Sequence, residues 1–204
     1  MPDVVTGADG KPRCGWAAST PEYLRYHDQE WGRPVGDETR ILEKLCLEGF
    51  QSGLSWLTIL RKRAGFRAAF AGFDPVTVAG FGPADVERLL ADPGIVRHRA
   101  KIEAALANAR STLALRERSA SLAALVWSHR PAAVPAPRSF AEVPASTEGS
   151  TALSRELRRA GFRYVGPTTV YAAMQALGVV DDHLQACHVR AEVEGERARF
   201  TPPR

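Results

Sequence analysis

Several sequence patterns are scarce or missing in this chain. Cysteine occurs only three times, at Cys14, Cys46 and Cys187, and an odd number argues against a disulfide framework. We therefore expect free thiols or metal ligands in a reducing compartment. No apolar run is long enough to span a membrane, so we expect no membrane partner. The N-terminal residues lack the apolar stretch of a secretory signal, which makes the cytoplasm the expected location.

β-Branched residues do not alternate with polar ones over any strand-length segment, which argues against a sheet. Apolar residues recur instead at helical spacing, and this pattern predicts an all-α domain. The predicted helices cover 37–48, 53–63, 83–91, 96–115, 150–160 and 167–177. Asp74-Pro75 marks a further helix start. Several prolines predict an extended loop over 129–149.

Length and composition fit one domain. The 204 residues are 45% hydrophobic, which is enough to form a substantial core. The net charge of +4 suits a polyanionic partner, but such a charge is common among proteins that bind no nucleic acid. We expect a flexible leader over 1–12, a helical domain over 13–188 and a flexible tail over 189–204.

Two cysteines and two histidines form candidate metal-ligand pairs near opposite ends of the chain. Cys14 and His27 lie near the start, whereas His183 and Cys187 are four residues apart, on one face of a helix. Two thiolates and two imidazoles make a closed tetrahedral set that suits structural zinc, and one shared ion would clip the two segments together. Alternatively, these are ordinary core or surface residues, because the compact spacing of zinc fingers is absent. His188 leaves open which imidazole coordinates.

Glu48 stands on the apolar face of the predicted helix 37–48, in a part of the chain rich in aromatic residues. A carboxylate on such a face is costly unless it is paired or faces a polar cavity. The nearby aromatic residues are Trp16, Tyr23, Tyr26, Trp31, Phe50 and Trp56. Aromatic faces and a carboxylate together suit a flat cationic ligand. Alternatively, Glu48 caps the next helix or pairs with an arginine, and the aromatic residues are plain core.

A turn over 92–95 joins the predicted helices 83–91 and 96–115, and basic residues follow it. Such a turn exposes backbone N–H groups near a helix N-terminus, where a phosphate can bind. The basic residues would add affinity for nucleic acid that falls with salt. The alternative is an ordinary helical hairpin with a solvated basic face.

In their order along the chain, these features closely resemble the type I 3-methyladenine DNA glycosylases. The resemblance covers about 13–187 and is specific as a combination. It rests on RCGW at 13–16, YHDQEWG at 26–32, CLEGFQSGLSW at 46–56, GIVRHRAKI at 94–102, GFRYVG at 161–166 and DH at 182–183. The chain departs from the family at Phe50, where the family has a polar residue, in the leader before Arg13, and in the tail after Cys187.

The resemblance implies a helix-hairpin-helix fold with one structural zinc ion that joins the N- and C-terminal segments. It also implies that Glu48 contacts the excised base, and that Gly53 and Leu54 fill the space left by the everted nucleotide. The implied zinc ligands are Cys14, His27, His183 and Cys187. The implied residues around the base are Trp16, Tyr26, Trp31 and Trp56. The residues that would hold the DNA backbone are Gly94, Arg97, Arg99 and Lys101.

The implied activity is hydrolytic release of 3-methyladenine from double-stranded DNA in base-excision repair, by a monomer, with free 3-methyladenine as product. Methylation at N3 makes adenine cationic and weakens its glycosidic bond, so the base leaves neutral and needs no general acid. Glu48 would recognise this base after the nucleotide leaves the stack and would stabilise charge on the sugar, with water activation as a secondary role. We expect no strand cleavage, because Lys101, the nearest candidate amine, better suits a phosphate contact.

Two rival functions stay open on the residues alone. A zinc-clipped DNA-binding module would bind DNA in a salt-sensitive way and release no base. A zinc-dependent hydrolase would carry water in place of one metal ligand, so chelation would stop turnover before it loosens the fold. The deaminase signature, His-x-Glu followed by Pro-Cys-x-x-Cys, is absent.

Overall fold

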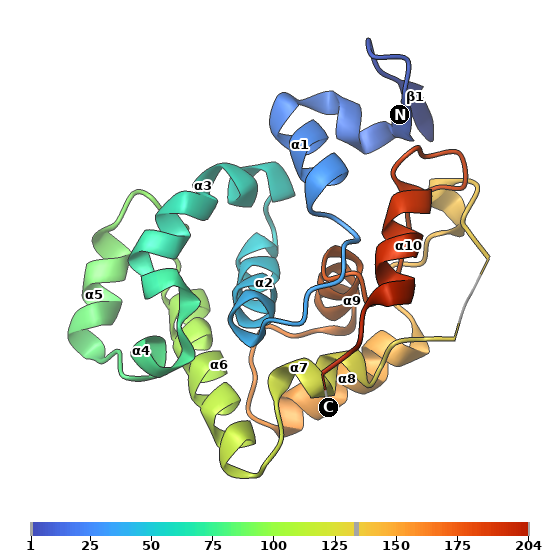
Figure 1. Ribbon diagram of the computed structural model, residues 1–204. Helices are drawn as coiled ribbons and strands as arrows, with labels where there is room; N and C mark the ends of the chain where they lie inside the picture. The colour runs from blue at the N-terminus through green and yellow to red at the C-terminus, as the bar shows by residue number, and fades with distance from the viewer. Residues whose placement is uncertain (1, 133–134, 204) are drawn as a thin grey trace.

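Helices dominate the computed structural model, which describes residues 2–132 and 135–203 (Figure 1). The helices are α1 (Pro21–Gln29), α2 (Glu38–Gln51), α3 (Trp56–Ala69), α4 (Pro75–Ala79), α5 (Pro83–Ala91), α6 (Arg99–Glu117), α7 (Leu122–Trp127), α8 (Glu148–Arg159), α9 (Pro167–Ala176) and α10 (Arg190–Arg199). Short 3-10 helices are η1 (Gly15–Ser19), η2 (Ala71–Phe73) and η3 (Phe140–Glu142). Among the helices of the described part, none is both long enough and apolar enough to cross a membrane.

The six predicted helices correspond to α2, α3, α5, α6, α8 and α9, and local signals in the sequence set several of their starts. The side chains of Asp37, Ser55 and Thr147 each accept a hydrogen bond from the backbone N–H three residues ahead. Pro83 and Pro167 take the first positions of α5 and α9, where the missing N–H costs nothing. Helices α1, α7 and α10 are not among the predicted ones.

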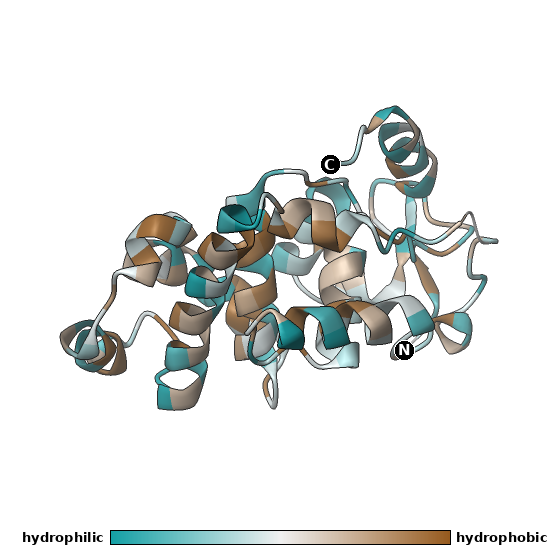
Figure 2. Cartoon of the chain, turned by 90° about the horizontal axis from the view of Figure 1, so that it is seen from below, coloured by the Kyte–Doolittle hydropathy of each residue, from teal (hydrophilic) through white to brown (hydrophobic). Residues whose placement is uncertain are grey.

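Helix α2 lies in the middle of the molecule and packs against α3, α6, α7 and α9. In Figure 1, α3 to α6 lie on one side of α2, and α9 and α10 lie on the other. Hydrophobic residues gather on the helices in the middle of the molecule (Figure 2). The apolar residues Ile41, Leu45 and Phe50 of α2 are almost completely buried. A polar side chain on α2 is therefore enclosed by neighbouring helices, which bears directly on Glu48.

The N-terminal segment forms a short antiparallel β-hairpin, where the sequence predicts a flexible leader and no sheet. Strand β1 (Val4–Thr6) pairs with strand β2 (Pro12–Cys14). Arg13 is buried, and its guanidinium donates hydrogen bonds to the carboxylates of Asp9 and Asp28. An ion-pair network thus ties the hairpin to α1. The structure differs from the prediction because strands of three residues are too short to show an alternating pattern.

The C-terminal residues form helix α10, where the sequence predicts a flexible tail over 189–204. Val193 is fully buried, and the ring of Phe200 packs 4.5 Å from that of Trp127. The helix is otherwise polar, so its hydropathy pattern does not reveal how two apolar side chains anchor it. The predicted loop over 129–149 contains the short η3. Residues 133–134 of that loop, like residues 1 and 204 of the leader and tail, lie outside the described part.

Candidate active site and metal site

A cavity of about 440 Å³ lies between η1, α1, α2, α3 and α9, and aromatic side chains make up much of its wall. The residues that line it are Trp16, Ser19, Tyr23, Tyr26, Trp31, Glu48, Gln51, Trp56, Phe140, Val143, Ala172, Gln175 and Asp182. A largely apolar cavity with a few polar groups suits a small organic ligand. Glu48 and the four aromatic residues predicted to surround the base are all in this wall.

The aromatic side chains of the cavity pack against one another and so hold their positions. The ring centroid of Trp16 lies 5.2 Å from that of Trp31 and 5.6 Å from that of Tyr23, both edge-on. The rings of Tyr26 and Trp56 lie 5.6 Å apart. Edge-on and tilted pairs of this kind are favourable beyond the area they bury. The cavity therefore presents a stiff aromatic wall, to which η1, α1, Trp31 and α3 contribute.

Glu48 is the acidic group that α2 places in this wall, and its side chain is 5% exposed. Its Oε1 atom lies 3.0 Å from the Nζ atom of Lys44, one helical turn earlier. Lys44 is itself only 11% exposed. The partner of the buried carboxylate is thus a lysine on the same helix, rather than the arginine or the helix cap considered above.

The Lys44 ammonium contacts two more groups that also line the cavity. It donates a hydrogen bond to the Tyr26 hydroxyl at 2.6 Å and lies 3.7 Å from the centre of a Trp56 ring. Burial lowers the pKa of Lys44, and the negative charge of Glu48 opposes that change. Burial, with Glu48 nearby, also raises the pKa of Tyr26 well above its usual value. Sequence reasoning missed Lys44, although its spacing of four residues from Glu48 is a signal for an ion pair.

Gln51 and Asp182 are two further polar residues of the wall that were not predicted to surround the base. The Asp182 carboxylate accepts hydrogen bonds from the Tyr171 hydroxyl at 2.7 Å and from Gln175 at 2.8 Å. These contacts fix Asp182 against α9. Both residues stand in motifs that carry the family resemblance, at 46–56 and 182–183, but the tertiary structure is needed to place them in the cavity wall.

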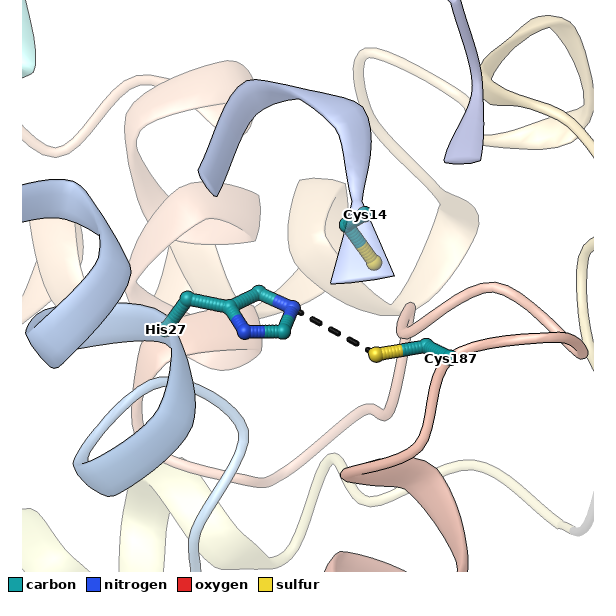
Figure 3. A group of neighbouring side chains, drawn as sticks. All are labelled: Cys14, His27 and Cys187. Carbon is teal, nitrogen blue, oxygen red and sulfur yellow. Dashed lines mark hydrogen bonds between the residues drawn. The ribbon is translucent and has the colours of Figure 1, made fainter. Parts of the chain in front are cut away.

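Cys14, His27 and Cys187 meet in a buried cluster, although they come from β2, α1 and the segment before α10 (Figure 3). Their candidate ligand atoms all lie within 4.8 Å of one another, and the Cys187 Sγ atom is 3.5 Å from the His27 Nε2 atom. A hydrogen bond from Cys14 lowers the pKa of Cys187, and the same contact raises the pKa of Cys14. The pair therefore favours one thiolate, which is the form that binds a metal.

His183, the fourth predicted ligand, lies beside this cluster, with its ring centroid 5.0 Å from that of His27. It is fully buried, and its Nε2 atom has no hydrogen-bond partner among residues 2–132 and 135–203. The Nδ1 atoms of His183 and His27 lie 2.8 Å from the carboxylates of Asp181 and Asp28, respectively. Each carboxylate favours the tautomer that leaves Nε2 free for a metal. The structure thus brings together the ligand atoms of Cys14, His27 and Cys187, which could hold a metal ion, and places His183 beside them. His188 contacts Asp28 from outside the cluster.

The turn between α5 and α6 contains Gly94 and Arg97, and Arg99 begins α6; all three are predicted to hold the DNA backbone. The Asp92 carboxylate accepts a hydrogen bond from the Gly94 N–H at 2.7 Å, which shapes the turn. Arg97 is exposed. Arg99 is also exposed and pairs with Glu87 on the surface. The two arginines are therefore accessible from solvent on the side of the hairpin.

The turn between α2 and α3 contains Gly53 and Leu54. Gly53 has a φ of 81°, in the left-handed region that favours glycine, and Leu54 is 42% exposed. Lys101 reaches this turn from α6. Its ammonium donates to the carbonyls of Phe50 at 2.9 Å and Ser52 at 2.5 Å, and the residue is only 8% exposed. The phosphate contact predicted for Lys101 stays a prediction; in the structure its ammonium contacts these two protein carbonyls.

Comparisons with known proteins agree on one family. The model of the methyladenine glycosylase family matches residues 16–191. The chain is 47% identical over 178 residues to DNA-3-methyladenine glycosylase 1 of Escherichia coli (strain K12), a match that covers 86% of this chain and 95% of that protein.

Solved structures give the same result. A crystal structure of 3-methyladenine DNA glycosylase I aligns with a TM-score of 0.84 and 45% identity, covering 86% of this chain and 98% of that one. A single-residue variant of 3-methyladenine DNA glycosylase I, solved in complex with 3-methyladenine, aligns with a TM-score of 0.83 and 34% identity, covering 87% of this chain and 97% of that one. On the family model, the sequence identity and the shared fold, this chain belongs to the methyladenine glycosylase family.

Proposed function

We propose that this protein is a DNA-3-methyladenine glycosylase that hydrolyses the N-glycosyl bond of 3-methyladenine in double-stranded DNA. The observation that carries the proposal is the buried carboxylate of Glu48 in an aromatic cavity of about 440 Å³. A base inside the duplex cannot reach such a cavity, so the nucleotide must be flipped out at a cost of a few kcal/mol. The relatives described above carry this activity in their names.

The chemistry of the damaged base decides what the protein has to supply. Methylation at N3 gives the base a positive charge, and the base becomes neutral as the glycosidic bond breaks. No general acid is therefore needed. Glu48 accepts hydrogen bonds from the base and stabilises positive charge that develops on the sugar. Tyr26 and Trp56 offer aromatic faces on which a flat base stacks.

Lys44 changes the charge balance of this pocket. Because its ammonium lies 3.0 Å from Glu48, the two charges largely cancel at a distance. The pocket therefore attracts a cationic base less strongly than an isolated carboxylate would. Stacking and directed hydrogen bonds consequently supply much of the selectivity. Excision then depends mainly on the weakened bond of the methylated nucleotide.

A structural zinc ion fits the proposed enzyme at the cluster near the chain ends. Cys14, His27, His183 and Cys187 would hold it. The Nε2 atom of His183, which has no hydrogen-bond partner among residues 2–132 and 135–203, and the buried thiols of Cys14 and Cys187 support this ligand set. Four protein ligands leave no open coordination position, so the ion would clip β2 and α1 to the segment before α10. The edge contact between the rings of His183 and Trp31, 4.6 Å apart, links this clip to the wall of the cavity.

The remaining parts of the proposal concern the grip on DNA. The segment from α5 to α6 serves as a helix-hairpin-helix unit whose turn at Gly94 binds backbone phosphate, with Arg97 and Arg99 beside it. Gly53 and Leu54 enter the space that the flipped nucleotide leaves. The exposure of Leu54 supports that role. We expect the enzyme to act as a monomer in the cytoplasm.

The decisive experiment is chromatography of the bases released from methylated duplex DNA. The proposed enzyme releases 3-methyladenine faster than a buffer control, and the Glu48→Gln variant releases it more slowly. DNA binding without base release would support a binding module instead. Loss of activity on chelation before any loss of fold would support a zinc hydrolase. A protein–DNA adduct trapped by borohydride would show a lyase and contradict the absence of strand cleavage.

A further inference from the structure

Lys101 lies in the first turn of α6, directly after the hairpin turn that contains Gly94. It is a long cationic side chain beside a candidate DNA surface, yet it is only 8% exposed. Burial lowers its pKa. A lysine placed to meet phosphate has no need of such burial, since exposed ammonium groups bind phosphate well. The burial of the Lys101 side chain therefore needs an explanation other than a phosphate contact.

The Lys101 ammonium holds the end of α2. It donates to the Phe50 carbonyl at 2.9 Å and to the Ser52 carbonyl at 2.5 Å. The last carbonyls of a helix lack partners within the helix and carry partial negative charge, so a cation there is favourable. The residue between the two carbonyls is Gln51, whose side chain lines the aromatic cavity. Lys101 thus holds a part of the cavity wall from outside.

The same two carbonyls lead into the turn that contains Gly53 and Leu54. A Cβ atom at Gly53 would have no atom within 4 Å, and Leu54 is 42% exposed, so this turn projects from the molecule. A projecting turn with few contacts of its own depends on anchors at its base. Lys101 provides such an anchor on the α2 side.

Two more contacts join the hairpin to α3, on the other side of the projecting turn. The Lys62 ammonium donates to the Pro93 carbonyl at 2.6 Å. A Cβ atom on Gly65 would lie 2.5 Å from the Gly94 carbonyl oxygen, so the backbones of α3 and the hairpin turn are in direct contact. The end of α2, the start of α6 and α3 therefore form one connected block.

From this geometry we infer that Lys101 is a positioning residue that couples the hairpin to Gln51 and to the Gly53–Leu54 turn. The inference rests on the proposed function. When the hairpin binds the DNA backbone, Lys101 fixes the positions of Gln51 and of the Gly53–Leu54 turn relative to the bound DNA. The flipped base can then enter the cavity while the turn fills the space that the nucleotide leaves. Lys101 itself contacts protein carbonyls and does not contact the DNA.

The dependence of DNA binding on salt distinguishes this role from a phosphate contact. Each phosphate contact contributes about 0.9 to the slope of log affinity against log salt concentration. We would measure this slope for the wild type, Lys101→Met and the control Lys11→Met, which removes an exposed lysine from the N-terminal hairpin. We expect Lys101→Met to keep the wild-type slope. A slope smaller by about 0.9 than in the wild type and in Lys11→Met would show a phosphate contact and overturn the inference.

Excision kinetics supply the second measurement. We expect Lys101→Met to lower the single-turnover rate on duplex DNA by about tenfold or more, because misplacement of binding groups is costly. The circular dichroism spectrum of Lys101→Met should stay close to that of the wild type and would show that the variant is folded. Lys101→Arg keeps the charge and the donors, so it should recover most of the rate. A wild-type rate in Lys101→Met would overturn the inference.

Failure of the inference and failure of the proposed function give different results. If the wild type releases no 3-methyladenine, the proposed function fails, and the salt slope still tests Lys101 because it requires only DNA binding. If Lys101→Met does not fold, Lys101→Arg and Lys101→Gln take its place. Gln donates hydrogen bonds without a charge, so Lys101→Gln should keep part of the excision rate if Lys101 positions the wall through its hydrogen bonds. If Lys101→Gln lost duplex affinity and excision rate by the same factor, the positioning role would be contradicted.

Discussion

Replacing Lys44 with methionine tests the buried ion pair of the pocket. Methionine keeps an unbranched side chain of similar length but removes the charge 3.0 Å from Glu48. At an effective dielectric constant of about 20, two unit charges at that distance attract by about 5.5 kcal/mol, and desolvation of both groups offsets much of it. Removing one partner of a buried pair costs about 3–5 kcal/mol, because the other charge stays buried alone. Because the cavity gives Glu48 some access to water, we expect Lys44→Met to lower the free energy of unfolding by about 3 kcal/mol, the lower end of that range.

Thermal denaturation measures this cost. For a domain of this size, about 3 kcal/mol lowers Tm by roughly 6–12 °C. The double variant Lys44→Met with Glu48→Gln leaves no unpaired buried charge and should recover much of the loss, which a double-mutant cycle would report as coupling. A Tm for Lys44→Met within about 1 °C of wild type would show that the pair contributes little. Equal losses in the single and double variants would assign the effect to packing rather than to the charge on Glu48.

Three further substitutions test other parts of the structure. Trp56→Ala removes a stacking face and should weaken binding of free 3-methyladenine by about 1–3 kcal/mol in calorimetry, whereas an unchanged affinity would place the base elsewhere. His183→Ala should lower Tm and should lower the zinc content below one ion per chain, as measured by elemental analysis. A zinc content of one ion per chain in this variant would show that His183 is not a ligand. Gly65→Ala places a Cβ atom 2.5 Å from the Gly94 carbonyl oxygen, so it should weaken binding to undamaged duplex while free-base binding persists. Wild-type duplex affinity would show that the hairpin turn tolerates displacement.

Sequence patterns predict the helices well where a helix is long and has its own start signal. Helices α2 and α8 have periodic apolar faces and side-chain caps at Asp37 and Thr147, so the information is local. Helix α7 has only six residues, too few for a period to show. The N-terminal hairpin depends on an ion pair between Arg13 and Asp28, which lie in different elements. Contacts of that kind leave no local pattern.

In the candidate site, too, some residues have a local signal in the sequence and others are revealed only by the tertiary structure. Glu48 could be predicted because a carboxylate on an apolar helix face is unusual. The spacing of four residues between Lys44 and Glu48 signals an ion pair but not its burial, because lysine and glutamate at this spacing usually pair on the surface. Its burial comes from Tyr26 and Trp56, which α1 and α3 bring to α2. For Lys101, the positive charge predicts a phosphate contact, whereas the burial of its side chain appears only in the tertiary structure.

Calorimetry of free 3-methyladenine tests the base pocket most directly. We expect wild-type protein to bind 3-methyladenine at one site per chain and to bind adenine more weakly. Glu48→Gln should reduce the affinity for 3-methyladenine, because the carboxylate accepts hydrogen bonds from the base. If folded wild-type protein bound no 3-methyladenine, or bound adenine equally well, the cavity around Glu48 would not be the site that recognises the methylated base.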